Sequence, residues 1–323
     1  MAAGIVVGLL RRLLRLPEQI PSLIADLTDG HVEARLVPGI VAVSAVSLIG
    51  GASLGPEKAL GSMGGGAGSW IARRRALGHD DSKVNTLSGF AGAYGGLFSS
   101  TVIVEMLILE VARPGGQRFT KALVGGIVAS SVSFGIYFAI AGSVFPDAYK
   151  VPQYTFHDWQ LLAGVPLGVF AVVVVTVLVV FIKGATELFG RLKVPVIAKP
   201  VLGGAVFGIV GVALPLTMFS GSDQLNTVLS GAGTLGLGVL IAKMLTFAVS
   251  QESGFVGGPI FPALFIGGTA GVLVHQVLPG VPLGLAFTCL LAAVPGALVA
   301  APFTMVLLAA FMTQVGRCRP HPS

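Results

Sequence analysis

The apolar sequence of this chain is interrupted at residues 50–57, which read Gly50-Gly51-Ala52-Ser53-Leu54-Gly55-Pro56-Glu57. Proline is favoured in the first turn of an α-helix, so we expect a helix to begin at this point. Apolar sequence both precedes and follows the break. The segment therefore predicts a helix that starts within a membrane-embedded stretch.

The same pattern, in which glycine or alanine leads to proline and then to more apolar sequence, occurs twice more. The two segments are Ser253-Gly254-Phe255-Val256-Gly257-Gly258-Pro259-Ile260-Phe261-Pro262 and Ala300-Ala301-Pro302-Phe303-Thr304. Any one of them alone is equally well explained as a packing kink between helices. Their recurrence in both halves of the chain is typical of transporters with broken helices.

A helix that starts inside a membrane points unpaired N–H groups and the positive end of its dipole at whatever lies ahead of it. Two such starts that converge would bind an anion without a full positive charge, which favours passage over trapping. The segments therefore predict an anion site.

The composition agrees with a membrane protein. Of 323 residues, 54% are hydrophobic and 11% are charged, whereas roughly a quarter are charged in an ordinary soluble domain. Stretches almost free of charge span residues 36–55, 122–144, 161–182, 201–219, 228–250 and 255–312. Several exceed the roughly 18 apolar residues that a spanning helix needs. We therefore expect an all-α, polytopic transmembrane protein.

The net charge of +6 does not indicate nucleic-acid binding. The basic residues form short clusters between apolar stretches, which is typical of loops on the inner side of a membrane. The five histidines are scattered and the two cysteines lack metal-site spacing, so neither a metal nor a cofactor is expected. Because no nucleophile–base pair is visible, an enzyme is the least favoured interpretation.

All three segments also resemble parts of a known family. Ala52-Ser53-Leu54-Gly55-Pro56 is similar to the G-K/R-E-G-P segment of the CLC chloride channels and anion/proton exchangers, and Gly258-Pro259-Ile260-Phe261-Pro262 is similar to their G-x-F-x-P segment. Leu107 to Pro114 resembles the family helix that ends in Arg-Pro, and Ala301-Pro302-Phe303-Thr304 its A-P-L-T helix.

The resemblance runs from about Ile20 to Thr313. It implies a homodimer in the lipid bilayer, with a chloride pore in each subunit built from two inverted repeats. The anion-binding residues that it implies are Leu54, Gly55, Pro56, Gly258, Ile260 and Phe261. Pro259 has no N–H, so the second segment would coordinate an anion through Ile260 and Phe261.

The sequence departs from the family at both of its proton-transfer glutamates. Leu54 stands where the family has its outer glutamate. Glu57 is either a displaced substitute or a cap on the helix dipole, and we favour the cap slightly. Val111 stands at the position of the inner glutamate, with Glu110 beside it. Glu57 and Glu110 are therefore the candidates for gating or proton transfer.

The chain also differs from the family in extent. Residues 1–150 are expected to form the first membrane repeat without its first helices, and residues 151–323 the second without its last helix, with no cytoplasmic regulatory domain. The anion-binding serine of the family's G-S-G-I-P motif is missing from Pro17-Glu18-Gln19-Ile20-Pro21. We expect the protein to lie in the plasma (cell inner) membrane.

Because both glutamates are replaced, the sequence favours passive conduction of chloride or a similar small anion. A proton-coupled anion exchanger that uses Glu57 or Glu110 is the first alternative. The second alternative is a non-conducting fragment that serves only in assembly.

Overall fold

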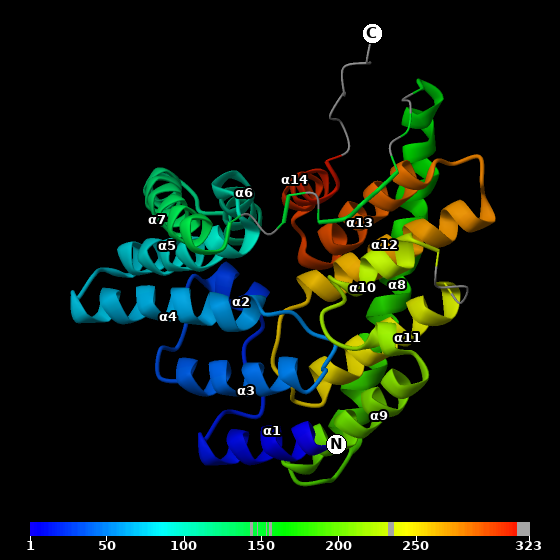
Figure 1. Cartoon of the computed structure of the whole chain (residues 1–323). Coiled ribbons are helices and arrows are strands. Elements are labelled where there is room, and N and C mark those ends of the chain that lie inside the picture. Colours follow the sequence, from blue (N-terminus) through cyan, green and yellow to red (C-terminus); the bar gives the residue numbers. More distant parts are fainter. Residues whose placement is uncertain (143–144, 147, 153, 155–156, 232–235, 315–323) are drawn as a thin grey trace.

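The computed structural model describes residues 1–142, 145–146, 148–152, 154, 157–231 and 236–314. These residues form fourteen α-helices and one 3-10 helix, and their only strand-like pairing is an antiparallel bridge between Gly55 and Gly258. The all-α prediction is confirmed (Figure 1). The helices are α1 (Ala2–Leu13), α2 (Leu23–Asp29), α3 (Val37–Ile49), α4 (Glu57–Arg74), α5 (His79–Phe98), α6 (Thr101–Ala112), α7 (Gln117–Ala141), α8 (Trp159–Arg191), α9 (Ala198–Ala213), η1 (Pro215–Thr217), α10 (Gln224–Leu229), α11 (Gly236–Glu252), α12 (Ile260–Val277), α13 (Leu283–Val299) and α14 (Pro302–Thr313).

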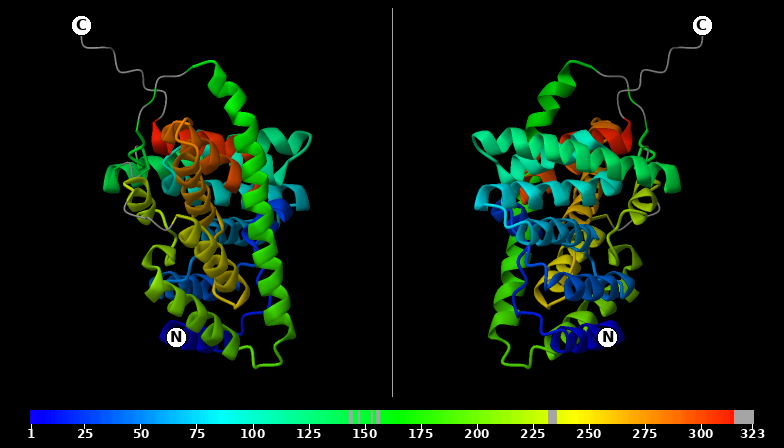
Figure 2. Two further views of the ribbon diagram at one scale, coloured as in Figure 1. Left: turned by 90° about the vertical axis from the view of Figure 1, so that its right-hand side faces the viewer. Right: turned by 90° about the vertical axis from the view of Figure 1, so that its left-hand side faces the viewer.

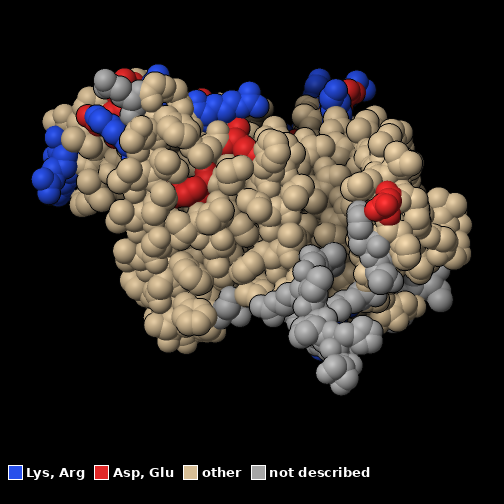
Figure 3. Space-filling model, turned by 90° about the horizontal axis from the view of Figure 1, so that it is seen from above, with Lys and Arg blue, Asp and Glu red and all other residues tan. Residues whose placement is uncertain are grey.

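Several helices are suited to a bilayer by length and composition. Three segments are long and apolar enough to cross one, namely Arg118–Ala141, Trp159–Arg191 and Ile260–Val277. The longest of them, α8, runs along nearly the full height of the molecule (Figure 2). Seen from above, the Lys and Arg side chains lie mainly at the margins, a few Asp and Glu side chains lie farther in, and most of the visible surface is uncharged (Figure 3).

The predicted helix starts are all present. Helix α3 ends at Ile49 and α4 begins at Glu57, while α11 ends at Glu252 and α12 begins at Ile260. The third break separates α13 from α14, which begins at Pro302. In each case proline lies at or just before the first helical residue, as its fixed φ angle favours.

A shift of 203 residues makes the ranges of α1 to α6 overlap those of α9 to α14, in the same order. Gly51 and Gly254 both have positive φ angles, +84° and +99°, and lie 203 residues apart. Gly55 and Gly258 are separated by the same interval, and their antiparallel bridge relates the two series by a local two-fold axis. The inverted repeats are thus visible at the segments that start α4 and α12. The predicted boundary at residue 150 stays a prediction.

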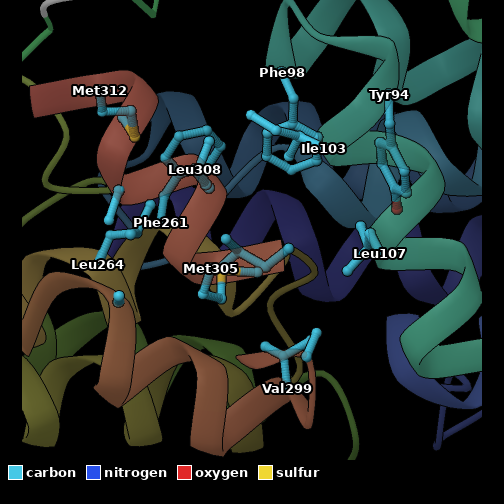
Figure 4. Close-up of a cluster of buried hydrophobic side chains, with 14 of the residues drawn as sticks. Tyr94, Phe98, Ile103, Leu107, Phe261, Leu264, Val299, Met305, Leu308 and Met312 are labelled. Carbon is cyan, nitrogen blue, oxygen red and sulfur yellow. The ribbon is translucent and has the colours of Figure 1, made fainter. Parts of the chain in front are cut away.

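The start of α12 is fixed by aromatic packing. The ring of Phe261 stacks on Phe98, with centroids 6.5 Å apart, and on Phe145, with centroids 5.7 Å apart. Met305 and Leu308 of α14 are buried in the same cluster (Figure 4). The side chain of Phe261 is therefore committed to the core, which leaves its backbone N–H to face the junction with α4.

Candidate functional site

The two glycine-rich segments meet through backbone hydrogen bonds. The N–H of Gly55 donates to the carbonyl of Gly258 over 2.9 Å, and the N–H of Gly258 donates to the carbonyl of Gly55 over 2.7 Å. The N–H of Leu54 donates to Ala52. These three N–H groups are thus engaged, so an anion at this junction would depend on donors in the first turns of α4 and α12.

Glu57 supplies the carboxylate at that junction. Its side chain is fully buried, and Oε1 accepts a hydrogen bond from the N–H of Phe261 over 2.8 Å. The backbone N–H groups of Glu57 itself and of Ile260 also interact with this carboxylate. A side chain on either Gly55 or Gly258 would overlap Oε2 of Glu57. The carboxylate therefore fills the space between the two helix starts.

The interpretation of Glu57 as a cap on its own helix is incomplete. A cap would serve α4 alone, whereas Oε1 binds the first turn of α12. Within the described residues, no Lys or Arg pairs with Glu57. Backbone N–H groups at the starts of two helices surround Oε1, whereas Oε2 is buried without a hydrogen-bond partner in the described part of the chain. Helix starts of this kind also bind free anions.

The residue that follows Glu57 in the sequence, Lys58, forms a buried ion pair. Nζ of Lys58, the second residue of α4, is 2.5 Å from Oδ2 of Asp26 on α2, and their side chains are 4% and 7% exposed. The pair joins the short helix α2 to the start of α4. Because both charges are buried, each depends on the other for its stabilisation.

A cavity of about 670 Å³ reaches this region from the surface. Its walls include residues 18–24, residues 251–257, Pro259 and Lys58. The cavity thus runs along both the segment that leads into α2 and the segment that leads into α12. Gly257, Pro259 and Lys58, which line the cavity, are the sequence neighbours of Gly258, Ile260 and Glu57 at the junction.

Arg11 joins these two segments at the cavity wall. Its Nη1 donates to the carbonyl of Gly254 over 2.8 Å, and its Nη2 donates to the carbonyls of Pro17 and Glu18 over 2.8 and 2.7 Å. Arg11 is 6% exposed. Its guanidinium therefore ties the two segments together through their backbone carbonyls.

The mouth of the cavity carries a second pair of charges. Nζ of Lys199, at the start of α9, lies 2.8 Å from Oε1 of Glu18. The hydrogen bond and charge of this ammonium hold the pKa of the exposed Glu18 carboxyl below its usual range. Glu18 is therefore charged at neutral pH, and its carboxylate largely neutralises the charge of Lys199.

The other predicted proton-transfer residue, Glu110, is engaged elsewhere. Its carboxylate accepts hydrogen bonds from the N–H groups of Phe303 over 2.9 Å and Thr304 over 2.7 Å, and from the Thr304 hydroxyl. Glu110 thus caps the start of α14. Its neighbour Val111 is buried in the hydrophobic core.

Sequence reasoning missed several of these groups. No motif marks Arg11, and the Asp26–Lys58 pair joins residues 32 positions apart, which no motif links. Lys243, which no motif of the sequence marks, is fully buried and donates to the carbonyls of Thr217, Met218 and Phe219. The described residues hold no cluster of His, Cys, Asp and Glu suited to a metal ion.

The amino-acid sequence is similar to that of a known protein family. A family model described as voltage gated chloride channel matches residues 3–317. YfeO of Salmonella newport (strain SL254), which is named as an ion-transport protein, is 28% identical over 304 residues, covering 88% of this chain and 70% of its own. The same protein of Salmonella agona (strain SL483) matches equally well.

Two solved structures share the fold. A slow cyanobacterial Cl⁻/H⁺ antiporter superposes with a TM-score of 0.80 at 20% sequence identity, over 97% of this chain and 78% of its own. A CLC-type fluoride/proton antiporter superposes with a TM-score of 0.73 at 17% identity, over 96% of this chain and 88% of its own.

Proposed function

Because the chain belongs to the voltage-gated chloride channel (CLC) family of integral membrane proteins, we propose that it carries chloride or a similar small anion between the starts of α4 and α12. The observation that carries the proposal is the carboxylate of Glu57, which accepts the N–H of Phe261 at that junction. A carboxylate and a transported anion need the same N–H donors, so the two compete for one position.

In this proposal Glu57 is the gate. While its carboxylate lies between Gly55 and Gly258, no second anion can occupy the same space. Protonation of Glu57, or rotation of its side chain, removes the negative charge from the helix starts and leaves the N–H groups of Ile260 and Phe261 to the transported anion.

We propose that conduction is passive. Leu54 and Val111 cannot carry protons, and the carboxylate of Glu110 is bound to the first turn of α14. A protonatable Glu57 at the junction therefore has no second carboxylate among the predicted pair with which to exchange protons across the membrane.

The second candidate is a proton-coupled anion exchanger. The position of Glu57 favours it, because one carboxylate that both blocks the anion and takes up a proton can couple the two movements. Both structural neighbours are also proton antiporters.

The test is anion flux from liposomes that contain the purified protein, with the external pH recorded under an imposed chloride gradient. Chloride efflux without proton movement is the expected result. Efflux that drives protons against their gradient would replace passive conduction by exchange. No flux of chloride or fluoride from liposomes holding folded protein would contradict both and favour a non-conducting assembly subunit.

We also propose that the protein is a homodimer in the cell inner membrane. The apolar side chains Phe303, Val306 and Leu307 on α14 are 67%, 56% and 38% exposed. Chemical crosslinking in the membrane, followed by denaturing electrophoresis, should give a species of twice the chain mass.

A further inference from the structure

Each glycine-rich segment is held by a serine from the opposite repeat. Oγ of Ser47, on α3, accepts a hydrogen bond from the N–H of Val256 over 3.1 Å. Oγ of Ser250, on α11, accepts one from the N–H of Ser53, also over 3.1 Å. Both serines are fully buried.

The two contacts are related by the same local symmetry as the glycine bridge. Ser47 and Ser250 each lie eight residues before the bridging glycine of their own repeat, and Ser53 and Val256 each lie two residues before it. The serine of each repeat therefore binds the segment of the other repeat at the equivalent position, which makes the pair reciprocal.

Each segment is also fixed farther from the junction. The carbonyl of Gly51 accepts the N–H of Phe219 over 3.2 Å, and the carbonyl of Gly254 accepts Nη1 of Arg11 over 2.8 Å. Both glycines lie four residues before their bridging glycine. Between these outer contacts and the Gly55–Gly258 bridge, the serine hydroxyl forms a hydrogen bond from one repeat to the other.

We propose that Ser47 and Ser250 are a reciprocal pair of positioning residues that set the register of the two segments, and so the spacing of the helix starts on either side of Glu57. Anion selectivity depends on this spacing, because the N–H donors of α4 and α12 must reach one anion at the same time. The inference rests on the proposed anion transport at this junction.

The two serines can set the register because each satisfies a buried N–H group that otherwise has no acceptor. Without the hydroxyl of Ser47, the N–H of Val256 is left buried and unpaired, which is unfavourable enough for the segment to turn toward another acceptor. Any such turn moves Gly258 against Gly55 and alters the distance between the first turns of the helices. The same argument applies to Ser250 and the N–H of Ser53.

The test compares Ser47→Ala and Ser250→Ala with a matched control, Ser44→Ala. Ser44 lies on α3, is equally buried, and its Oγ has no hydrogen-bond partner in the described part of the chain. The readout is the ratio of chloride to fluoride flux from liposomes, with the thermal unfolding temperature of each variant measured in detergent.

Each positioning variant should change the flux ratio about fivefold, the change expected for one lost hydrogen bond, and Ser44→Ala should leave it unchanged. The double variant should change it by less than the product of the single effects, because both serines act on one glycine bridge. Equal flux ratios in all variants would overturn the inference, and so would a change in unfolding temperature alone. Failure of the proposed function is distinct, because the wild-type protein itself would then carry no anion.

Discussion

The carboxylate of Glu57, in the first turn of α4, accepts a hydrogen bond from the backbone N–H of Phe261, in the first turn of α12, across 204 residues of sequence. One side chain thus belongs to the helix starts of both repeats. A change in the charge of Glu57 therefore alters the electrostatic environment of the starts of α4 and α12 together, as a gate between them requires.

Replacing Glu57 by glutamine should remove the gating charge while keeping the size of the side chain. We expect chloride flux at neutral pH to rise about tenfold, because a neutral amide holds the N–H donors less strongly than a carboxylate and the open state gains population. Wild-type flux should increase as the pH falls and Glu57 becomes protonated, whereas the variant should show no such increase. Flux assays in liposomes between about pH 5 and 8 would measure both the flux at neutral pH and its dependence on pH.

The control for this experiment is Glu33→Gln. Glu33 pairs with Arg35 at the surface, where their side chains are 42% and 77% exposed. It should keep the wild-type flux and pH response. An unchanged pH response in Glu57→Gln would exclude Glu57 as the gate.

Glu110→Gln should act on stability rather than on gating. The carboxylate of Glu110 accepts N–H groups at the start of α14, and hydrogen bonds to a charged acceptor contribute about 1.5–3 kcal/mol each at most. We expect a lower unfolding temperature in detergent, with the pH response of the flux retained. Loss of the pH response at unchanged stability would instead give Glu110 a role in proton transfer.

The broken helices could be predicted because their determinants are local. A proline after glycine or alanine fixes a helix start wherever it occurs, and the structure begins α4, α12 and α14 at the three positions that the sequence indicated. The apolar composition predicted the helical class in the same way.

The contacts across the repeats could not be predicted, because nothing local encodes them. The segments are alike at Gly51 and Gly254 and at Gly55 and Gly258, but Ser53 corresponds to Val256 and Glu57 to Ile260. The symmetry therefore lies in the backbone more than in the side chains. Whether a first-turn carboxylate caps its own helix or reaches another depends on which helix start lies opposite.

We expect substitutions of Lys58 and Asp26 to have strongly non-additive effects on the free energy of unfolding. Lys58→Met or Asp26→Leu alone leaves one buried charge without its partner and should destabilise the protein by about 3–5 kcal/mol. The double variant should recover most of this loss, because two apolar side chains need no counter-charge. Chemical denaturation of all three variants in detergent measures the coupling, and additive losses would show that the pair makes no net contribution.

The Glu18–Lys199 pair predicts an effect of pH and salt on anion access to the cavity. The lowered pKa of Glu18 means that the pair stabilises the folded state above the ordinary carboxyl pKa, and that this contribution is lost as the pH falls through the lowered value. Glu18→Gln should free the charge of Lys199 at neutral pH. We expect the half-saturating chloride concentration on the cavity side to fall about twofold at low ionic strength and to return to the wild-type value at high salt. A salt-independent change would contradict this electrostatic cause.

Substitutions of Arg11 distinguish the effect of its positive charge from the effect of its forked shape at the cavity wall. Arg11→Lys keeps the positive charge, but one ammonium cannot span the carbonyls of Gly254, Pro17 and Glu18 as the guanidinium fork does. We expect Arg11→Lys and Arg11→Gln to lower the free energy of unfolding by similar amounts, about 1–3 kcal/mol. Both variants should also carry less anion flux than the wild type. Arg12→Gln, at the exposed neighbouring position, is the control and should behave as the wild type. If Arg11→Lys retains full flux and stability, the charge of Arg11 is sufficient, and its bridging of the two segments is not what keeps the cavity open.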